Sequence, residues 1–288
     1  MKQDVPLDVL VMDDASSDDA TAGVVRQFPR ARYVRSEQRV GYIVLRNRAA
    51  RLASTDVLVS IDDDAVMVNP STVSSALAAF VTARVGAVSL RHVNVLDGKV
   101  IVRYASLPDD ERVFVKAEFV GTAYAVRREV FLGVGGYREH LVHQTEERDF
   151  CVRMLSAGYV VRAGVTPPIE HRMSPIRSHK RMTVYNNRNN LLFAWQNVPW
   201  PSLPVHVLGT TVNGLWTGLR WRRMGWTTAG LAQGYAAMVT GRYERRPVSR
   251  SIYQLHRRLI KCGPLLLDEI EGELPLLTSP GPNSQTQR

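Results

Sequence analysis

Residues 57–70 read VLVSIDDDAVMVNP, an apolar run followed by three consecutive aspartates and a mixed stretch that ends in proline. The apolar run predicts a strand over residues 56–64, which places Asp62, Asp63 and Asp64 at its carboxyl end. Ligands of α/β proteins bind at the carboxyl ends of the strands, and carboxylates there can hold a hard divalent cation and, through it, phosphate oxygens. The other interpretation of these three residues is a solvated loop whose acids precede the next helix.

Strand-like and helix-like patterns alternate on both sides of this stretch. Strands are predicted at residues 8–14, 31–37, 56–64, 86–95 and 158–171. Helices are predicted at residues 16–28, 44–54, 71–83 and 146–158, and a strand, a short helix and a glycine turn at 119–137. In the last helix, Asp149 and Arg153 are spaced for an ion pair, and Gly158 is placed to end the helix. The alternation predicts an α/β fold with a mostly parallel sheet flanked by helices.

Composition limits the class of protein. A chain of 288 residues, 45% of them hydrophobic, can bury a full core. The two cysteines, Cys151 and Cys262, form neither a disulfide framework nor a zinc-type spacing, which is typical of a reducing compartment. The first residues contain acids where a signal peptide has its apolar region, and no apolar run predicts a spanning helix. We therefore expect a cytoplasmic protein.

Charge is distributed unevenly along the chain. Residues 1–171 hold 21 Lys or Arg and 22 Asp or Glu, a balance of −1, whereas residues 172–261 hold 15 Lys or Arg and a single acid, Glu244, a balance of +14. The strand and helix alternation stops at the same place. We therefore predict an α/β domain over residues 1–172 and a basic helical region over residues 173–288 that ends in a frayed tail. The basic balance indicates an anionic partner.

A second acidic cluster, Asp13 and Asp14, also lies at a predicted strand end. Within the first cluster, residues 62 and 64 of an extended chain face one way and residue 63 faces the other. One of Asp62 and Asp64 can therefore reach a metal directly, and the other a sugar hydroxyl or a second metal position.

Six motifs follow one another along the chain: VMDDASSDDAT (11–21), VGYIVLRNRAA (40–50), IDDD (61–64), VGTAYAVRREVFLGVGGYRE (120–139), TEERDFCVRMLSAGY (145–159) and EHRMS (170–174). In this order they resemble the family 2 glycosyltransferases with the GT-A fold, in particular the rhamnosyltransferase-like members. The resemblance implies a GT-A-like catalytic domain that transfers a sugar from a nucleotide-diphosphate donor to a hydroxyl group.

The same resemblance implies a nucleotide-sugar site. Asp13, with its neighbour Asp14, corresponds to the residue that meets the nucleotide base. Arg46 is expected near the nucleotide or its diphosphate, and its alternative interpretation is a surface arginine on a helix.

The resemblance also implies a metal site, which the motifs IDDD (61–64) and EHRMS (170–174) would form. Asp62 and Asp64 match the D-x-D metal motif, Asp64 being favoured for direct coordination, and Asp63 between them is expected on the donor side. His171 matches the histidine that completes the metal site in many members, although a lone histidine is more often structural. The expected cofactor is Mn²⁺ or Mg²⁺.

The catalytic base is expected at the acidic pair Glu146 and Glu147, with Glu147 favoured. Inverting transfer needs a base that takes the proton of the acceptor hydroxyl while its oxygen attacks the anomeric carbon from the face opposite the leaving group. The start of a helix is a favourable place for an ionised carboxylate, and the simpler interpretation is that the pair only caps that helix. Gly135, Gly136 and Tyr137 resemble the turn that shapes the acceptor side.

The chain departs from the family at its start. Members begin with a strand, a polar loop and a helix before the first acidic motif, and only seven residues precede Asp8 here. The resemblance thus implies that the first βα unit is lacking, through either a misassigned start or a true loss that leaves a strand edge unpaired.

Two other functions compete. SIDDDAV fits the D-x-D-x-[TV] pattern of haloacid-dehalogenase-type phosphatases, but their later G-D-x-x-x-D-like motif has no match because no Gly-Asp dipeptide occurs. A degenerate glycosyltransferase-like module that only binds a partner is the stronger rival.

The basic segment 172–261 has three interpretations. It can contact anionic lipid headgroups, with four tryptophans at the interface: Trp200, Trp216, Trp221 and Trp226. It can receive a lipid-diphosphate or anionic glycan acceptor, or it can bind nucleic acid, for which no motif is present. We expect peripheral attachment to the cytoplasmic face of the membrane, a glycan or lipid-linked acceptor in cell-surface polysaccharide synthesis, and no nucleic acid.

Overall fold

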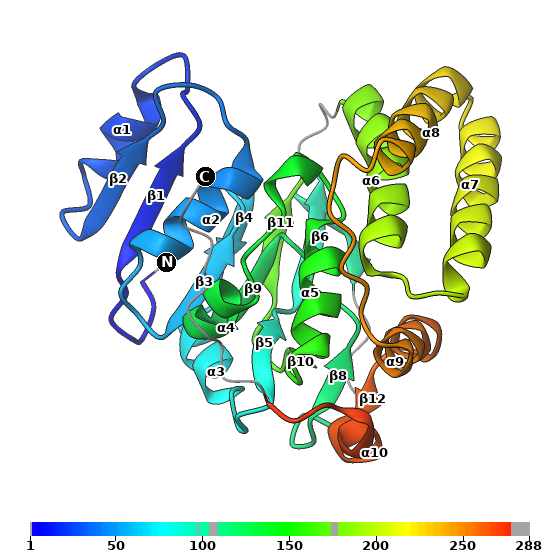
Figure 1. The fold of residues 1–288 in the computed structure, drawn as a ribbon. Helices are drawn as coiled ribbons and strands as arrows, with labels where there is room; N and C mark the ends of the chain where they lie inside the picture. The colour runs from blue at the N-terminus through cyan, green and yellow to red at the C-terminus, as the bar shows by residue number, and fades with distance from the viewer. Residues whose placement is uncertain (1, 97, 104–108, 174–177, 278–288) are drawn as a thin grey trace.

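The computed structural model describes residues 2–96, 98–103, 109–173 and 178–277. Its N-terminal part is a small parallel sheet (Figure 1) in which β1 (Val9–Asp13) pairs with β2 (Ala31–Arg35) across the short helix α1 (Ala20–Val25). Helix α2 (Tyr42–Leu52) follows and packs against β1. The predicted strands and helix of this part are confirmed within a few residues, with α1 shorter than expected.

A six-stranded sheet forms the centre of the molecule, in the order β12-β8-β10-β5-β9-β3. Its strands are β3 (Val57–Ile61), β5 (Val85–Ser89), β8 (Phe114–Lys116), β9 (Ala123–Arg127), β10 (Val160–Ala163) and β12 (Leu265–Leu266). β3 is the strand predicted from the opening stretch, and its edge position puts the three aspartates at the border of this sheet.

Strand directions differ from the expectation of a mostly parallel sheet. Among the hydrogen-bonded neighbours of the central sheet, β10 and β5 are parallel, whereas β9 lies antiparallel between β5 and β3, and β8 lies antiparallel to β10 and β12. Parallel neighbours need a long crossover connection, usually a helix. Among the described residues, the chain between β5 and β9 contains strands and no helix, so β9 returns antiparallel to its neighbours. The α/β class with flanking helices is confirmed.

A third sheet, of four strands in the order β4-β11-β6-β7, lies beside the aspartates. It consists of β4 (Ala65–Met67), β6 (His92–Leu96), β7 (Lys99–Arg103) and β11 (Ile169–Arg172). Its register sets His171 opposite Ala65 on one side and Asn94 on the other. The strands predicted at 86–95 and 158–171 are therefore each divided between the central sheet and this one.

Helices cover the sheets and share their core. The helices of the first half are α3 (Thr72–Ala78), α4 (Arg128–Gly133), the 3₁₀ turn η1 (Glu139–Leu141) and α5 (Glu146–Ser156). Helix α5 is the helix predicted at 146–158, and Gly158 follows it with φ +87°, as expected for a glycine that ends a helix. The predicted ion pair of Asp149 with Arg153 is also present, at 2.8 Å.

The region after residue 178 is mostly helical. Its elements are α6 (His179–Asn197), α7 (Ser202–Arg220), α8 (Met224–Val239), α9 (Arg250–Cys262), α10 (Leu267–Ile270) and η2 (Glu271–Glu273). α6, α7 and α8 form a bundle on one side of the molecule (Figure 1). Phe193 of α6 and Leu255 of α9 lie in one buried cluster with Val115 and Val160 of the central sheet. The core therefore extends across the predicted boundary at residue 172, and the predicted frayed tail lies outside the described residues.

In the part of the chain that the structure describes, none of the helices combines the length and the apolar character needed to cross a bilayer.

Candidate functional site

Asp62 lies directly after β3 and is held by Arg46 of α2. The Arg46 guanidinium donates to Asp62 Oδ1 and, at 3.0 Å, to the carbonyl of Gly121. Burial raises the pKa of Asp62, Arg46 lowers it and Asp64 raises it again. A cation near both acids would therefore stabilise their ionised forms.

Asp64 faces His171 across the edge of the third sheet. Asp64 Oδ2 lies 3.3 Å from His171 Nε2, and the other ring nitrogen, Nδ1, lies 2.7 Å from Asn94 Oδ1. Because an amide oxygen accepts the Nδ1 hydrogen, Nε2 of the neutral ring presents its lone pair to the carboxylate. Two electron-rich atoms in this position are stabilised by a shared proton or by a divalent cation, and the oriented second nitrogen is typical of histidines that bind metals.

Asp62, the third predicted ligand, is turned to Arg46. Among residues 2–96, 98–103, 109–173 and 178–277, no group of three or more His, Cys, Asp or Glu side chains is arranged to hold a metal ion. The pair of Asp64 and His171 fits part of the donor set that Mn²⁺ accepts, and the exposed Asp63 takes part in no described hydrogen bond or ion pair.

The acids at the end of β1 accept hydrogen bonds from backbone N–H groups and from the Tyr33 hydroxyl. Asp13 is 4% exposed, and its carboxylate accepts hydrogen bonds from the Tyr33 hydroxyl and the Ser16 N–H, which lower its pKa in that order. Asp14 accepts from the N–H groups of Val40 and Gly41, at 2.7 and 3.1 Å, immediately before α2. Asp14 thereby fixes the helix that carries Arg46.

Glu146 is buried at the start of α5 and bound to α2. Its Oε1 accepts from the Tyr42 hydroxyl at 2.6 Å, and only 1% of the residue is exposed. Burial raises its pKa, which the bond from Tyr42 partly offsets. Glu146 is thus engaged in positioning Tyr42 and the helix start.

Glu147 converges with Arg46 on Gly121. A Cβ at Gly121 would overlap the Glu147 Oε1 atom and lie 3.4 Å from an Arg46 nitrogen, so both side chains lie directly over this glycine. Burial, reinforced by the neighbouring charge of Glu146, raises the pKa of Glu147 to about 8. A carboxylate with a pKa near neutrality is suited to general base catalysis. The site therefore joins Glu147, Arg46 and Asp62 in one group.

The segment before α5 has a strained backbone. Val142, Gln144 and Thr145 have φ angles of +63°, +66° and +74°, which residues with side chains adopt at a cost. The buried amide of Asn189, on α6, donates to the carbonyls of residues 141, 143 and 144 at 2.8–2.9 Å. The C-terminal region thus helps to hold the conformation that leads into the two glutamates.

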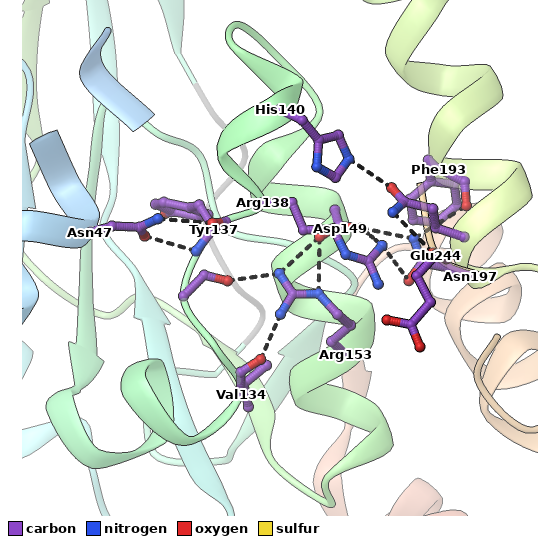
Figure 2. A network of polar contacts seen from close by, with 12 residues as sticks. Asn47, Val134, Tyr137, Arg138, His140, Asp149, Arg153, Phe193, Asn197 and Glu244 are labelled. Atoms are coloured by element: carbon purple, nitrogen blue, oxygen red, sulfur yellow. Dashed lines mark hydrogen bonds and ion pairs between the residues drawn. The ribbon is translucent and has the colours of Figure 1, made fainter. Parts of the chain in front are cut away.

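Figure 2 shows how α5 is anchored on its other side. Asp149, 1% exposed, accepts hydrogen bonds from Arg138 at 2.6 Å, Arg153 at 2.9 Å and Asn197 at 2.8 Å. Arg153 also donates to the carbonyls of Val134 and Gly136. A buried charge with this many partners keeps its pKa low and fixes the helix relative to the turn before it.

The turn expected on the acceptor side is packed against α2. Asn47 exchanges hydrogen bonds with the backbone of Tyr137, and its Oδ1 would lie 2.7 Å from a Cβ at Gly136, whose φ is +62°. Tyr137 itself is 2% exposed and packs among Phe131 and Phe150. Its side chain is part of the core and Gly136 is buried as well, so of these three residues only Gly135 is exposed to shape a surface.

Sequence reasoning missed four residues that position this site: Tyr33, Tyr42, Asn94 and Asn189. Tyr42 could have been found, because it lies four residues before Arg46 on the same helix face, where the guanidinium stands 5.1 Å from its ring. The other three act across distant segments, and no local pattern marks them.

A cavity of about 480 Å³ lies beyond the strained segment, between η1, α6 and α8. It is lined by seven residues, none of them acidic: His140, Val142, Tyr185, Arg188, Gln233, Arg242 and Tyr243. Arg188 donates to the His140 carbonyl and the Tyr243 hydroxyl, and the rings of His140 and Tyr243 stack at 4.0 Å. With two arginines and no acid among these residues, the cavity is suited to an anionic ligand.

Comparison with known proteins identifies related sequences and folds. Residues 2–134 match the sequence model described as glycosyl transferase family 2. A search among curated protein sequences finds no match.

Similar folds occur in solved structures. The mannosyltransferase PcManGT from Pyrobaculum calidifontis, in complex with GDP-Man and Mn²⁺, is 20% identical with a TM-score of 0.52, over 90% of this chain and 77% of that one. TarS 1–349 of S. aureus, in complex with UDP-GlcNAc, is 12% identical with a TM-score of 0.56, over 94% and 81%. GalNAc-T7 with UDP, GalNAc and Mn²⁺ is 16% identical with a TM-score of 0.51, over 65% of this chain and 44% of that one. This chain thus has the GT-A fold of these transferases.

Proposed function

Since residues 2–134 match the model of glycosyl transferase family 2 and the chain has the fold of these transferases, we propose that it moves a sugar from a nucleoside-diphosphate donor to a hydroxyl of an acceptor, with inversion at the anomeric carbon. The observation that carries the proposal is the convergence of Glu147 and Arg46 over Gly121, beside Asp62. A carboxylate of raised pKa next to a fixed cation and an acidic metal motif is the arrangement that such a transfer needs.

The donor lies along the strand ends in this proposal. Asp13 and Asp14 are assigned to the nucleoside side, with Asp14 acting through the loop before α2, and Asp63 is available to the sugar. Arg46 is assigned to the diphosphate. The similar structures that contain GDP-Man and UDP-GlcNAc support a nucleotide sugar as donor.

Asp64 and His171, with Asp62 as the third ligand, would hold the metal. A bound Mn²⁺ or Mg²⁺ supplies Lewis acid stabilisation of the charge on the departing diphosphate. Asn94 keeps the His171 ring in the tautomer that presents Nε2. The fit of this pair and the Mn²⁺ in two of the similar structures support the assignment.

Glu147 is assigned as the base. Its carboxylate takes the proton of the acceptor hydroxyl while that oxygen forms the bond to the anomeric carbon and the bond to the diphosphate breaks. Glu146 holds Tyr42 and is assigned as a positioning residue, since both its burial and its hydrogen bond remove it from solvent.

The acceptor is proposed to be a glycan or a lipid-linked molecule of cell-surface polysaccharide synthesis. An acid-free cavity with Arg188 and Arg242 on the far side of the strained segment supports an acceptor with an anionic group.

A test of the reaction uses a panel of radiolabelled nucleotide sugars with Mn²⁺ and a membrane lipid extract as the source of acceptors. We expect one donor to release its nucleoside diphosphate, and Glu147→Gln to lose this release while Asp56→Asn, at the opposite end of β3, keeps it. Proton NMR of early product from an α-linked donor is expected to show the β anomer. Retention of the α anomer would refute inversion, and no release from any donor would favour the binding-module alternative.

A further inference from the structure

Helix α7 turns a row of apolar side chains to solvent. Five of them are highly exposed: Val205 75%, Leu208 65%, Val212 57%, Trp216 58% and Leu219 69%. At 3.6 residues per turn these positions fall within about 80° of the helix circumference, along roughly 20 Å of its length. We refer to these five residues as the α7 face.

The opposite side of the helix is packed against its neighbours. A Cβ at Gly214 would overlap Asn187 of α6, and one at Gly218 would lie 2.5 Å from Thr227 of α8. Leu203 on the same side is 4% exposed. The α7 face is therefore directed away from the bundle, at the outer edge of the molecule (Figure 1).

Aromatic and basic residues border the α7 face. Trp200 precedes the helix and Trp221 follows it, 65% and 60% exposed. Arg220 stands 5.3 Å from the Trp216 ring and 5.9 Å from the Trp221 ring, and Arg222 and Arg223 follow. Residues 202–239 contain no Asp or Glu, and the three arginines take part in no ion pair within the described part of the chain.

We propose that the α7 face lies on the surface of a bilayer that contains anionic lipids, with the helix parallel to the membrane plane. Apolar side chains enter the boundary between headgroups and acyl chains, tryptophans favour this depth, and the arginines reach the phosphates. This agrees with the expectation for segment 172–261 and specifies which surface makes the contact.

Charge favours a lipid surface over a second copy of the chain. Two α7 faces brought together would each bring arginines and no acid from residues 202–239, so the contact would leave these charges without compensation. An anionic membrane supplies the missing negative charge.

Attachment of the α7 face would bring the segment before Glu146 and Glu147 close to the bilayer. α7 packs on α6, and Asn189 of α6 holds the carbonyls that lead into Glu146 and Glu147. A lipid-linked acceptor would then reach the site without leaving the membrane surface. This consequence rests on the proposed function, whereas the attachment itself does not.

Flotation of the full chain with vesicles tests the proposal. Wild-type protein is expected to float with phosphatidylcholine vesicles that contain phosphatidylglycerol, to float less with pure phosphatidylcholine, and to detach partly at high salt. The double change Leu208→Glu and Val212→Glu is expected to abolish flotation. The matched control is Val24→Glu and Phe28→Glu, two apolar residues of similar exposure and equal spacing near α1.

A second pair of variants tests the arginines. Changing Arg220, Arg222 and Arg223 to Gln is expected to lower the partition coefficient for anionic vesicles roughly a hundredfold. Changing Arg26, Arg30 and Lys99 to Gln removes the same charge from exposed positions elsewhere and is expected to leave it within a few-fold. All six positions are exposed or half-buried. Thermal melts verify that each variant is folded.

Two outcomes would overturn the proposal. One is flotation of the Leu208→Glu and Val212→Glu variant equal to that of the control variant. The other is light scattering that shows a wild-type dimer, which the same variant dissociates, together with no binding to anionic vesicles. Nucleoside-diphosphate binding by the variants is measured in parallel, and its retention separates loss of attachment from loss of the donor site.

Discussion

Glu147 has the pKa that a base needs near neutral pH. Burial and the adjacent Glu146 raise its pKa to about 8, so the carboxylate is mostly protonated at pH 6 and mostly ionised at pH 9. We expect the transfer rate to rise with pH and to level off above about 8. Glu147→Gln is expected to lower turnover about a hundred- to ten-thousandfold and to remove this dependence. A pH–rate profile of both proteins checks the prediction, and a rate independent of pH in the wild type would contradict it.

The same shift predicts how stability depends on pH. The pKa of Glu147 is 4.5 without its surroundings and about 8 in the folded chain. Between these values the folded state binds more protons than the unfolded state, so this residue lowers stability as pH rises. Glu147→Gln removes that loss. The melting temperature of the variant minus that of the wild type is therefore expected to be larger at pH 8 than at pH 5. Thermal melts at both pH values measure the difference, and an equal or opposite difference would argue against a buried, raised carboxyl.

Gly121 provides the space that Glu147 and Arg46 occupy. A methyl group there overlaps the Glu147 carboxylate, so Gly121→Ala is expected to displace the proposed base and reduce turnover roughly a hundredfold. Gly23→Ala, where a Cβ meets nothing within 4 Å, is the control and should leave turnover unchanged. Steady-state kinetics compare the two, and full activity of Gly121→Ala would place the catalytic group elsewhere.

At the scale of elements, α6 supports the strained segment before α5. Asn189→Ala leaves three carbonyls without their donor and removes the restraint on three residues of positive φ. We expect stability to fall by about 1–3 kcal/mol and turnover by roughly ten- to a hundredfold. Asn186→Ala, an exposed amide on the same helix, is the control. Urea unfolding measures the stability of both variants, and steady-state kinetics measure their turnover. A loss of stability with unchanged turnover would mean that the segment does not position the glutamates.

Local patterns predicted most elements and not how they pair. α5 was expected from apolar spacing and a terminal glycine, and β3 from its apolar run. The strand expected at 158–171 is divided because Pro167 and Pro168 interrupt it, so β10 and β11 join different sheets. The antiparallel return of β9 depends on contacts between distant segments, which a sequence window does not contain.

The sequence indicated the residues now proposed for the site, and it did not indicate their contacts. The order of the motifs pointed to Asp62, Asp64, His171 and the glutamate pair, because each residue type stands in a recognisable run. The partners of these residues come from the tertiary fold: Asp62 is bound by Arg46, and Asn94 reaches His171 only through the register of β6 with β11. Spacing along one chain cannot supply such information.

At the scale of the molecule, two sheets and the C-terminal helices meet around one site. The central sheet brings Asp62, and the third sheet brings His171. Helices α2 and α5 bring Arg46 and Glu147, and α6 fixes the segment between them. For the proposed function, the edge beside β3 must bind a nucleoside diphosphate together with a metal.

Titration calorimetry with UDP and with GDP, in the presence and absence of Mn²⁺, tests this requirement most directly. We predict that one of the two nucleotides binds with Mn²⁺ at least roughly tenfold more tightly than without it, and that Asp64→Asn removes the difference. Asp56→Asn, an exposed acid at the other end of the same strand, should behave as wild type. Binding that is the same with and without Mn²⁺, or unchanged in Asp64→Asn, would contradict the account.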